Sequence, residues 1–94
     1  MGLFYGGAAE THYVYILRNS NADQLYTGQT SDLQRRLKEH NRHSGSRQKY
    51  TGPDSGIWEL LHVEKYESKT IAIRREKFLK SGKGREWRKE KLGI

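Results

Sequence analysis

Two short runs of β-forming residues, separated by five turn-forming residues, constrain the fold of this chain most strongly. Residues 12–18 (HYVYILR) are rich in β-branched and aromatic side chains, and residues 24–28 (QLYTG) form a second such run. The intervening residues 19–23 (NSNAD) are typical of a turn. The pattern predicts a β-hairpin. Because side chains alternate across a strand, we expect Tyr13 and Tyr15 on one face and Val14 on the other.

A helix is predicted directly after the hairpin. Ser31 and Gln34 have the spacing of a capping box, in which each side chain bonds to the backbone of the other residue. Leu33, Leu37 and His40 then recur at i, i+4 and i+7, so the helix should continue to about residue 41. Residues 42–56 are polar, basic and rich in Ser and Gly, which predicts a long loop.

The sequence after residue 56 predicts one strand and two helices. Apolar residues in 57–66 do not alternate cleanly, which suggests a β-bulge or burial of both faces. Ser68 is the expected cap of a second helix, Gly82 its expected stop, and Trp87 the expected anchor of a third helix over 85–92. The apolar face of the second helix is expected to consist of Ile71, Ala72, Phe78 and Leu79.

The element order β-β-α-β-α-α predicts an α+β fold with a three-stranded, mainly antiparallel sheet flanked by helices. With 94 residues, the chain has room for one domain. We expect residues 1–11 to form a flexible lead-in and residues 12–94 to form that domain. The 18 Lys and Arg against 11 Asp and Glu give a net charge of +7, which indicates a polyanionic partner. No apolar stretch approaches a membrane span, and 0 Cys fits a reducing, cytoplasmic setting.

Three groups of polar residues are candidates for a site. Tyr15 and Tyr26 lie on the two arms of the hairpin, although cross-strand packing alone would also explain them. Arg36 and His40 are four residues apart on one helix face, where a His is also commonly structural. Glu76 falls on the apolar face of the second helix. A buried carboxylate needs a compensating metal ion or cation, and Arg36 is available for this role.

In these residues the chain resembles the GIY-YIG nuclease family, specifically its small stand-alone bacterial-type members. The first motif reads Tyr13-Val14-Tyr15, with Tyr in place of the leading Gly, and the second reads Tyr26-Thr27-Gly28, with Thr in place of Ile. The family's Arg, His and metal-binding Glu match Arg36, His40 and Glu76. The resemblance extends from about residue 12 to 87. This chain lacks the Asn that many family members carry late in the domain, because no Asn follows Asn41.

The resemblance implies a divalent-metal-dependent endonuclease that hydrolyses phosphodiester bonds in DNA. It implies a single Mg²⁺ or Mn²⁺ ion on Glu76, Tyr15 as general base with Tyr26 the next choice, and Arg36 as clamp on the scissile phosphate. His40 would accept the phenolic proton or orient the ring. The alternative is a catalytically weak nucleic-acid-binding module that retains the nuclease fold, and dependence of cleavage on metal separates the two.

No additional specificity domain is recognisable, so low sequence specificity is expected. Specificity would come from DNA structure, in repair or processing, or from a protein partner. The substrate is expected to be DNA, with RNA as the alternative, and the protein is expected to be a monomer or weak homodimer with no membrane association. The residues expected to contact nucleic acid are basic and lie in the first helix, the long loop, the second helix and the residues after it: Arg35, Lys38, Arg42, Arg47, Lys49, Arg74, Lys77, Lys80 and Lys83.

Overall fold

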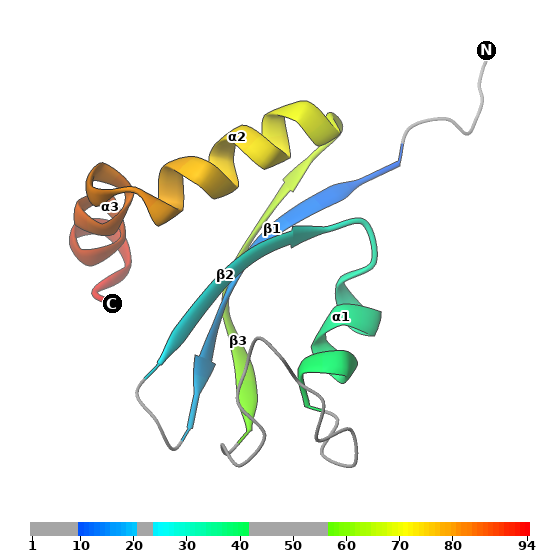
Figure 1. The fold of residues 1–94 in the computed structure, drawn as a ribbon, viewed down its shortest axis with the longest axis horizontal. Helices are drawn as coiled ribbons and strands as arrows, with labels where there is room; N and C mark the ends of the chain where they lie inside the picture. The colour runs from blue at the N-terminus through cyan, green and yellow to red at the C-terminus, as the bar shows by residue number, and fades with distance from the viewer. Residues whose placement is uncertain (1–9, 21–23, 42–56) are drawn as a thin grey trace.

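A three-stranded antiparallel sheet in the order β2-β1-β3 forms the centre of the molecule (Figure 1). The computed structural model describes residues 10–20, 24–41 and 57–94. The strands are β1 (His12–Asn19), β2 (Leu25–Thr30) and β3 (Trp58–Tyr66), and the helices are α1 (Leu33–His40), α2 (Lys69–Lys80) and α3 (Gly82–Leu92). The predicted α+β class and element order are confirmed. Residues 1–9 of the expected lead-in and the expected loop over 42–56 lie outside the described residues.

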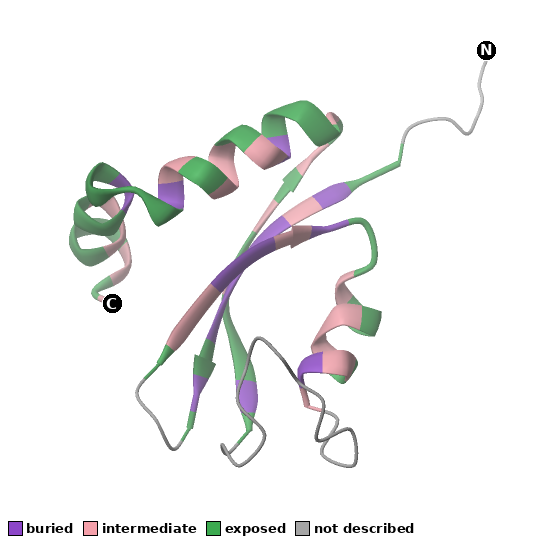
Figure 2. Ribbon diagram, viewed as in Figure 1, coloured by how far each residue is buried: buried purple, intermediate pink, exposed green. Residues whose placement is uncertain are grey.

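The central strand β1 separates two apolar clusters, one on each face of the sheet. Val14 and Ile16 pack with Ala72 and Leu79 of α2, and α3 adds partly buried side chains to this cluster. Tyr15 and Leu17 point to the opposite face, where they pack with Trp58 and with side chains of α1. This alternation is the one that the strand pattern predicts. Most buried residues lie in β1 and β2, between these two layers (Figure 2).

The irregular apolar pattern of β3 has a structural cause. Ile16 pairs with His62, but the next residue, Leu17, pairs with Leu60, so Leu61 has no partner on β1. This register shift is the bulge that the sequence suggested. A bulge inserts one residue and reverses the side-chain alternation beyond it.

The start of α1 differs by one residue from the sequence prediction, whereas the start of α2 agrees with it. The N-cap of α1 is Asp32 rather than Ser31: its carboxylate accepts a hydrogen bond from the Arg35 amide at 3.1 Å. The Asp32 amide in turn donates to the Thr30 hydroxyl at 3.0 Å, which ties the start of the helix to the end of β2. Ser68 caps α2 as predicted, with its hydroxyl accepting from the Ile71 amide.

Gly82 does not stop α2 in a left-handed conformation; it is the first residue of α3. Ser81 ends α2 in an extended conformation and caps α3 through its side chain. The glycine that this corner requires is Gly84, because a Cβ there would lie 1.9 Å from the Phe78 carbonyl oxygen. The predicted apolar face of α2 is also narrower than expected, since Ile71 is exposed. Among the described residues, no helix is long and apolar enough to cross a membrane.

Candidate active site

The hairpin places two tyrosines of the sequence motifs on the same face of the sheet. Tyr15 lies opposite Gly28 in the β1–β2 register, and Tyr26 lies opposite Leu17. Both rings join the cluster that packs against α1, with ring centroids 6.2 Å apart. Tyr15 is only 1% exposed, while Tyr26 is half-buried. The two hydroxyl-bearing rings are therefore neighbours, one inside the fold and one at its surface.

Gly28 makes room for both rings. A Cβ at this position would lie 2.7 Å from the Tyr15 hydroxyl oxygen and 3.0 Å from Cε2 of Tyr26. Distances this short require the Tyr15 ring to move, and its complete burial leaves it little freedom to do so. The glycine of the second motif is thus a packing requirement of the two tyrosines.

We expect Gly28→Ala to reduce both stability and any activity that depends on Tyr15. Overpacking should lower the free energy of unfolding by about 1–3 kcal/mol, and displacement of the ring should reduce cleavage by about 10²-fold. Urea unfolding and a cleavage assay would measure the two effects. Gly82→Ala is the matched control, because nothing lies within 4 Å of a Cβ there. Equal, near-zero effects of both substitutions would refute the packing role of Gly28.

Helix α1 adds Arg36 and His40 to the two tyrosines. The His40 ring lies 4.7 Å from the Tyr26 ring and 6.3 Å from the Tyr15 ring, measured between centroids. Arg36 is partly buried, donates to Glu39 at 3.2 Å, and is close enough to Tyr15 to lower the pKa of its hydroxyl. Tyr15, Tyr26, Arg36 and His40 therefore form one contiguous group.

The ionisation of Tyr15 depends on opposing effects. Burial raises the pKa of Tyr15 above its usual value, and the charges of Tyr26 and Glu76 raise it further. Arg36 acts in the opposite direction, through hydrogen bonding and charge, and lowers the pKa of Tyr15. The net direction is upward, so at neutral pH Tyr15 carries its proton when no substrate is present.

His40 is neutral at neutral pH. Burial lowers the pKa of His40 to about 4, and the charge of Arg36 contributes to this shift. A ring with so low a pKa is a weak acceptor for a phenolic proton. Of the two roles that the sequence suggested for His40, orientation of a tyrosine ring fits its geometry and its pKa better.

The same shift predicts a pH dependence of stability. The unfolded chain binds a proton at His40 near pH 6.5, whereas the folded protein does so only near pH 4. The unfolded state therefore binds more protons in this window, and stability should fall by about 3 kcal/mol as the pH drops from 6.5 to 4. His40→Gln should remove this component when free energies of unfolding are measured by urea titration across the window. If the free energies of unfolding of the two proteins changed in parallel with pH, His40 would not be the source of this pH dependence.

Glu76 projects from α2 as a half-buried carboxylate with a side-chain exposure of 20%. Its partner is Lys80, one turn further along the same helix, with the two charged groups 2.8 Å apart. The expectation of a compensating cation is met, but by Lys80 rather than by Arg36. The charge of Glu76 nevertheless reaches the Tyr15 hydroxyl, where it raises the pKa. Helix α2 thus places Glu76 near enough to Tyr15 for its charge to affect the ionisation of that tyrosine.

A single carboxylate of this kind suits a magnesium or manganese ion bound mainly by water and substrate. Among residues 10–20, 24–41 and 57–94, no group of three or more His, Cys, Asp or Glu could hold a metal ion. Mg²⁺ commonly binds through one or two carboxylates together with waters and substrate phosphates. The accessible oxygens of Glu76 fit that mode and do not form a closed protein site.

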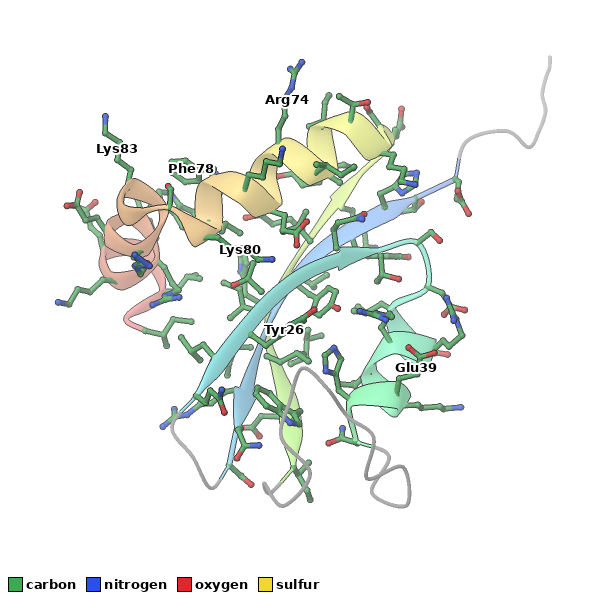
Figure 3. The ribbon with its side chains drawn as sticks, viewed as in Figure 1. Tyr26, Glu39, Arg74, Phe78, Lys80 and Lys83 are labelled. Carbon is green, nitrogen blue, oxygen red and sulfur yellow. The ribbon has the colours of Figure 1, made fainter. Side chains whose placement is uncertain are left out.

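The residues expected to bind nucleic acid are distributed over more than one surface. Figure 3 shows Lys80 directed toward the sheet, whereas Arg74 and Lys83 point away from it. Arg35 is exposed on α1 and engages Asp32 and Glu39. Lys38 and Lys77 are also exposed on their helices. Arg42, Arg47 and Lys49 lie outside the described residues.

Sequence reasoning missed a polar network that fixes α2 on the sheet. Glu64 of β3 accepts two hydrogen bonds from Arg75, at 2.9 and 3.0 Å, and one from Tyr66 at 2.6 Å. Although burial alone would raise the pKa of Glu64, its hydrogen bonds lower it to about 2. The Arg75 guanidinium also stacks 4.4 Å from the Trp87 ring centroid. Because Arg75 adjoins Glu76, this network fixes the part of α2 that carries the carboxylate.

The period-two spacing of His62, Glu64 and Tyr66 was the available signal for this network. These residues share one face of β3, and the His62 ring nitrogen lies 2.8 Å from the Glu64 carboxylate. The spacing predicts that these three residues lie together on the strand. It does not identify their partner, Arg75, which lies eleven residues after Glu64.

The chain is similar to several known proteins. The sequence matches the GIY-YIG catalytic domain over residues 11–91. A UPF0213 protein from Natronomonas pharaonis is 45% identical over 78% of this chain and 81% of its own length. One from Staphylococcus aureus is 38% identical over 77% and 83%. The solution NMR structure of a UPF0213 protein from Bacillus halodurans is 38% identical, covers 82% of this chain and 80% of that chain, and has a TM-score of 0.48. The chain belongs to the GIY-YIG family of nuclease catalytic domains.

Proposed function

We propose that this protein is a divalent-metal-dependent endonuclease that hydrolyses phosphodiester bonds in DNA. The supporting observation is the contiguous group of Tyr15, Tyr26 and His40, together with the charges of Arg36 from α1 and Glu76 from α2, both of which shift the pKa of Tyr15. GIY-YIG nucleases generally depend on a divalent metal ion. A nucleophile-activating group, a cation for the phosphate and a carboxylate for a metal ion are the components that phosphodiester hydrolysis requires.

Arg36 is suited to hold the scissile phosphate. Its planar guanidinium can form two parallel hydrogen bonds with phosphate oxygens. In the free protein it pairs with Glu39 at the edge of the site, with a side-chain exposure of 26%, so it remains accessible to a substrate. Glu76 would hold the metal ion. When bound, such an ion supplies positive charge to the phosphoryl oxygens and to nearby oxygen acids.

Tyr15 is our assignment for the general base, and Tyr26 is the alternative. Tyr15 must lose its proton to act, and Arg36 favours its ionised form. A phosphate bound by Arg36 would lie beside the Tyr15 hydroxyl, within reach of a water that attacks the phosphorus. His40 would orient the Tyr26 ring against which it packs.

The alternative is a nucleic-acid-binding module with little catalysis. The ion pair between Glu76 and Lys80 supports it, because the carboxylate is already compensated without a metal ion. The ion pair is exposed on its Lys80 side, and such pairs contribute only about 0.3–0.5 kcal/mol. A divalent cation can therefore displace the ammonium group.

Cleavage assays with and without Mn²⁺ separate the two functions. Supercoiled, single-stranded and branched DNA and a single-stranded RNA would be incubated with the protein in Mn²⁺ or in a chelator. The nuclease proposal expects products only with Mn²⁺; binding without products under every condition would favour the module. A preference for branched DNA would support a role in DNA repair or processing. We further propose a monomer or weak homodimer in a cytoplasmic setting, with a protein partner that supplies specificity.

A further inference from the structure

A cavity of about 270 Å³ lies beside Tyr26, between the outer edge of β2 and the end of α2 and start of α3. Its polar lining consists of Tyr26 and Thr27 from β2, Lys80 from α2, and Arg85 and Arg88 from α3. Two apolar residues, Leu25 and Leu79, complete it, and no Asp or Glu contributes to the lining. The cavity is therefore strongly cationic, with three basic side chains from two helices.

Two of these cations, Lys80 and Arg88, contact other residues of the chain. The Lys80 ammonium group is 2.8 Å from the Glu76 carboxylate, so it lies between the candidate metal residue and the cavity. Arg88 is half-buried, and its Nε donates to the Ile94 carbonyl oxygen at 3.2 Å. Arg85 is exposed and engages the rest of the chain through its backbone amide, which donates to Ser81. Because the residue is exposed, its guanidinium group is accessible to a ligand.

The cavity lies toward one end of β2, and a second cavity lies toward the other end. The second cavity, of about 300 Å³, is lined by Arg36 of the candidate active site, by two further cations, Arg35 and Lys69, and by the carboxylate of Glu10. Gly28 and the Tyr15 hydroxyl lie between the two ends of the strand. A chain of phosphates that crosses the edge of β2 at Tyr15 would meet cations both before and after the scissile bond.

We infer that Lys80, Arg85 and Arg88 form a subsite for a phosphate group that flanks the scissile phosphate on the same nucleic-acid strand. This inference rests on the proposed nuclease function and adds a contact, made mainly by α3, that fixes the substrate along β2. Arginine suits this role because its fork matches phosphate oxygens, and Tyr26 provides an adjacent aromatic surface for a base or sugar. The cations on the opposite side, Arg74 and Lys83, point away from this path (Figure 3).

The test compares Arg85→Gln with Lys65→Gln, which removes one positive charge from an exposed position on β3, at the edge of the sheet opposite β2. Binding of a short DNA duplex would be measured in a chelator across a range of salt concentrations. Arg85→Gln should weaken binding by about 10-fold and reduce the slope of log affinity against log salt by about 1. Arg85→Lys should recover most of that slope, and Lys65→Gln should leave affinity and slope near those of the unaltered protein.

Kinetics and substrate length add a second readout. In Mg²⁺, Arg85→Gln should raise KM and leave kcat unchanged, because the contact is remote from the reacting atoms. Shortening the DNA stepwise from one end, but not from the other, should abolish the difference between Arg85→Gln and the unaltered protein once the flanking phosphate is lost. Equal affinities and slopes for Arg85→Gln and Lys65→Gln would overturn the subsite while leaving the nuclease proposal intact. Absence of metal-dependent cleavage by the unaltered protein would overturn the nuclease proposal, and the binding measurements would still decide the subsite.

Discussion

Replacing Glu76 by glutamine is expected to reduce metal-dependent cleavage by about 10³-fold or more. The substitution keeps the size and polarity of the side chain but removes the negative charge that would hold the metal ion. Stability should change little, because the lost pair with Lys80 is a partly exposed i,i+4 contact. DNA binding should persist or become slightly tighter, since one negative charge near the phosphate path is removed.

Two measurements accompany that activity assay. Titration of Mn²⁺ into the protein should show weaker binding for Glu76→Gln, and circular dichroism should show an unchanged fold. Glu90→Gln is the matched control, because Glu90 is an exposed residue of α3. Full activity of Glu76→Gln at the same Mg²⁺ concentration would exclude Glu76 from the metal site.

Tyr15→Phe should reduce cleavage by about 10²–10⁴-fold, which is the usual contribution of general acid–base catalysis. The change removes the hydroxyl group and keeps the buried ring between Gly28 and Arg36, so the melting temperature should remain similar. The pKa of Tyr15 lies above its usual value. The rate of the unaltered protein should therefore rise with pH between about 6 and 9, and Tyr15→Phe should flatten that rise.

Two other tyrosines make this result interpretable. Tyr13→Phe makes the same chemical change two residues earlier on β1 and should have little effect on the rate. Tyr26→Phe should have an intermediate effect if Tyr26 only contacts the substrate. A large loss for Tyr26→Phe together with none for Tyr15→Phe would reverse the assignment of the base. Small losses at both positions would indicate a different base.

The elements and most of the site follow from local patterns in the sequence. Alternation in β1 placed Tyr15 opposite Val14, and the helical spacing placed Arg36 and His40 together, since these relations span only a few residues. The position of Glu76 beside Ala72 and Leu79 likewise predicted a carboxylate at the border of the core. In each case, the geometry of a single strand or helix was sufficient.

What the sequence did not reveal depends on distances between elements. Spacing identified Glu76 as needing a cation but not which cation lies nearest, and the one four residues along the same helix, Lys80, is its partner. Burial raises the pKa of Tyr15 more than Arg36 lowers it. Depth of burial is a property of the assembled fold and does not follow from local spacing. Similarly, Gly84 rather than Gly82 serves the close approach of α3 to α2, which depends on the packing of the two helices.

The most direct test of the central claim is a single-turnover assay on an end-labelled DNA duplex, with Mg²⁺ varied from zero to saturation at constant ionic strength. We expect no cleavage in a chelator, a rate that rises with Mg²⁺ and saturates, and loss of that rate when Glu76 is replaced by glutamine. Adding Mg²⁺ after the chelator should restore the full rate to the unaltered protein. Cleavage that proceeds equally in the chelator, or no cleavage at any Mg²⁺ concentration by a folded protein that binds the duplex, would contradict the assignment of a metal-dependent nuclease.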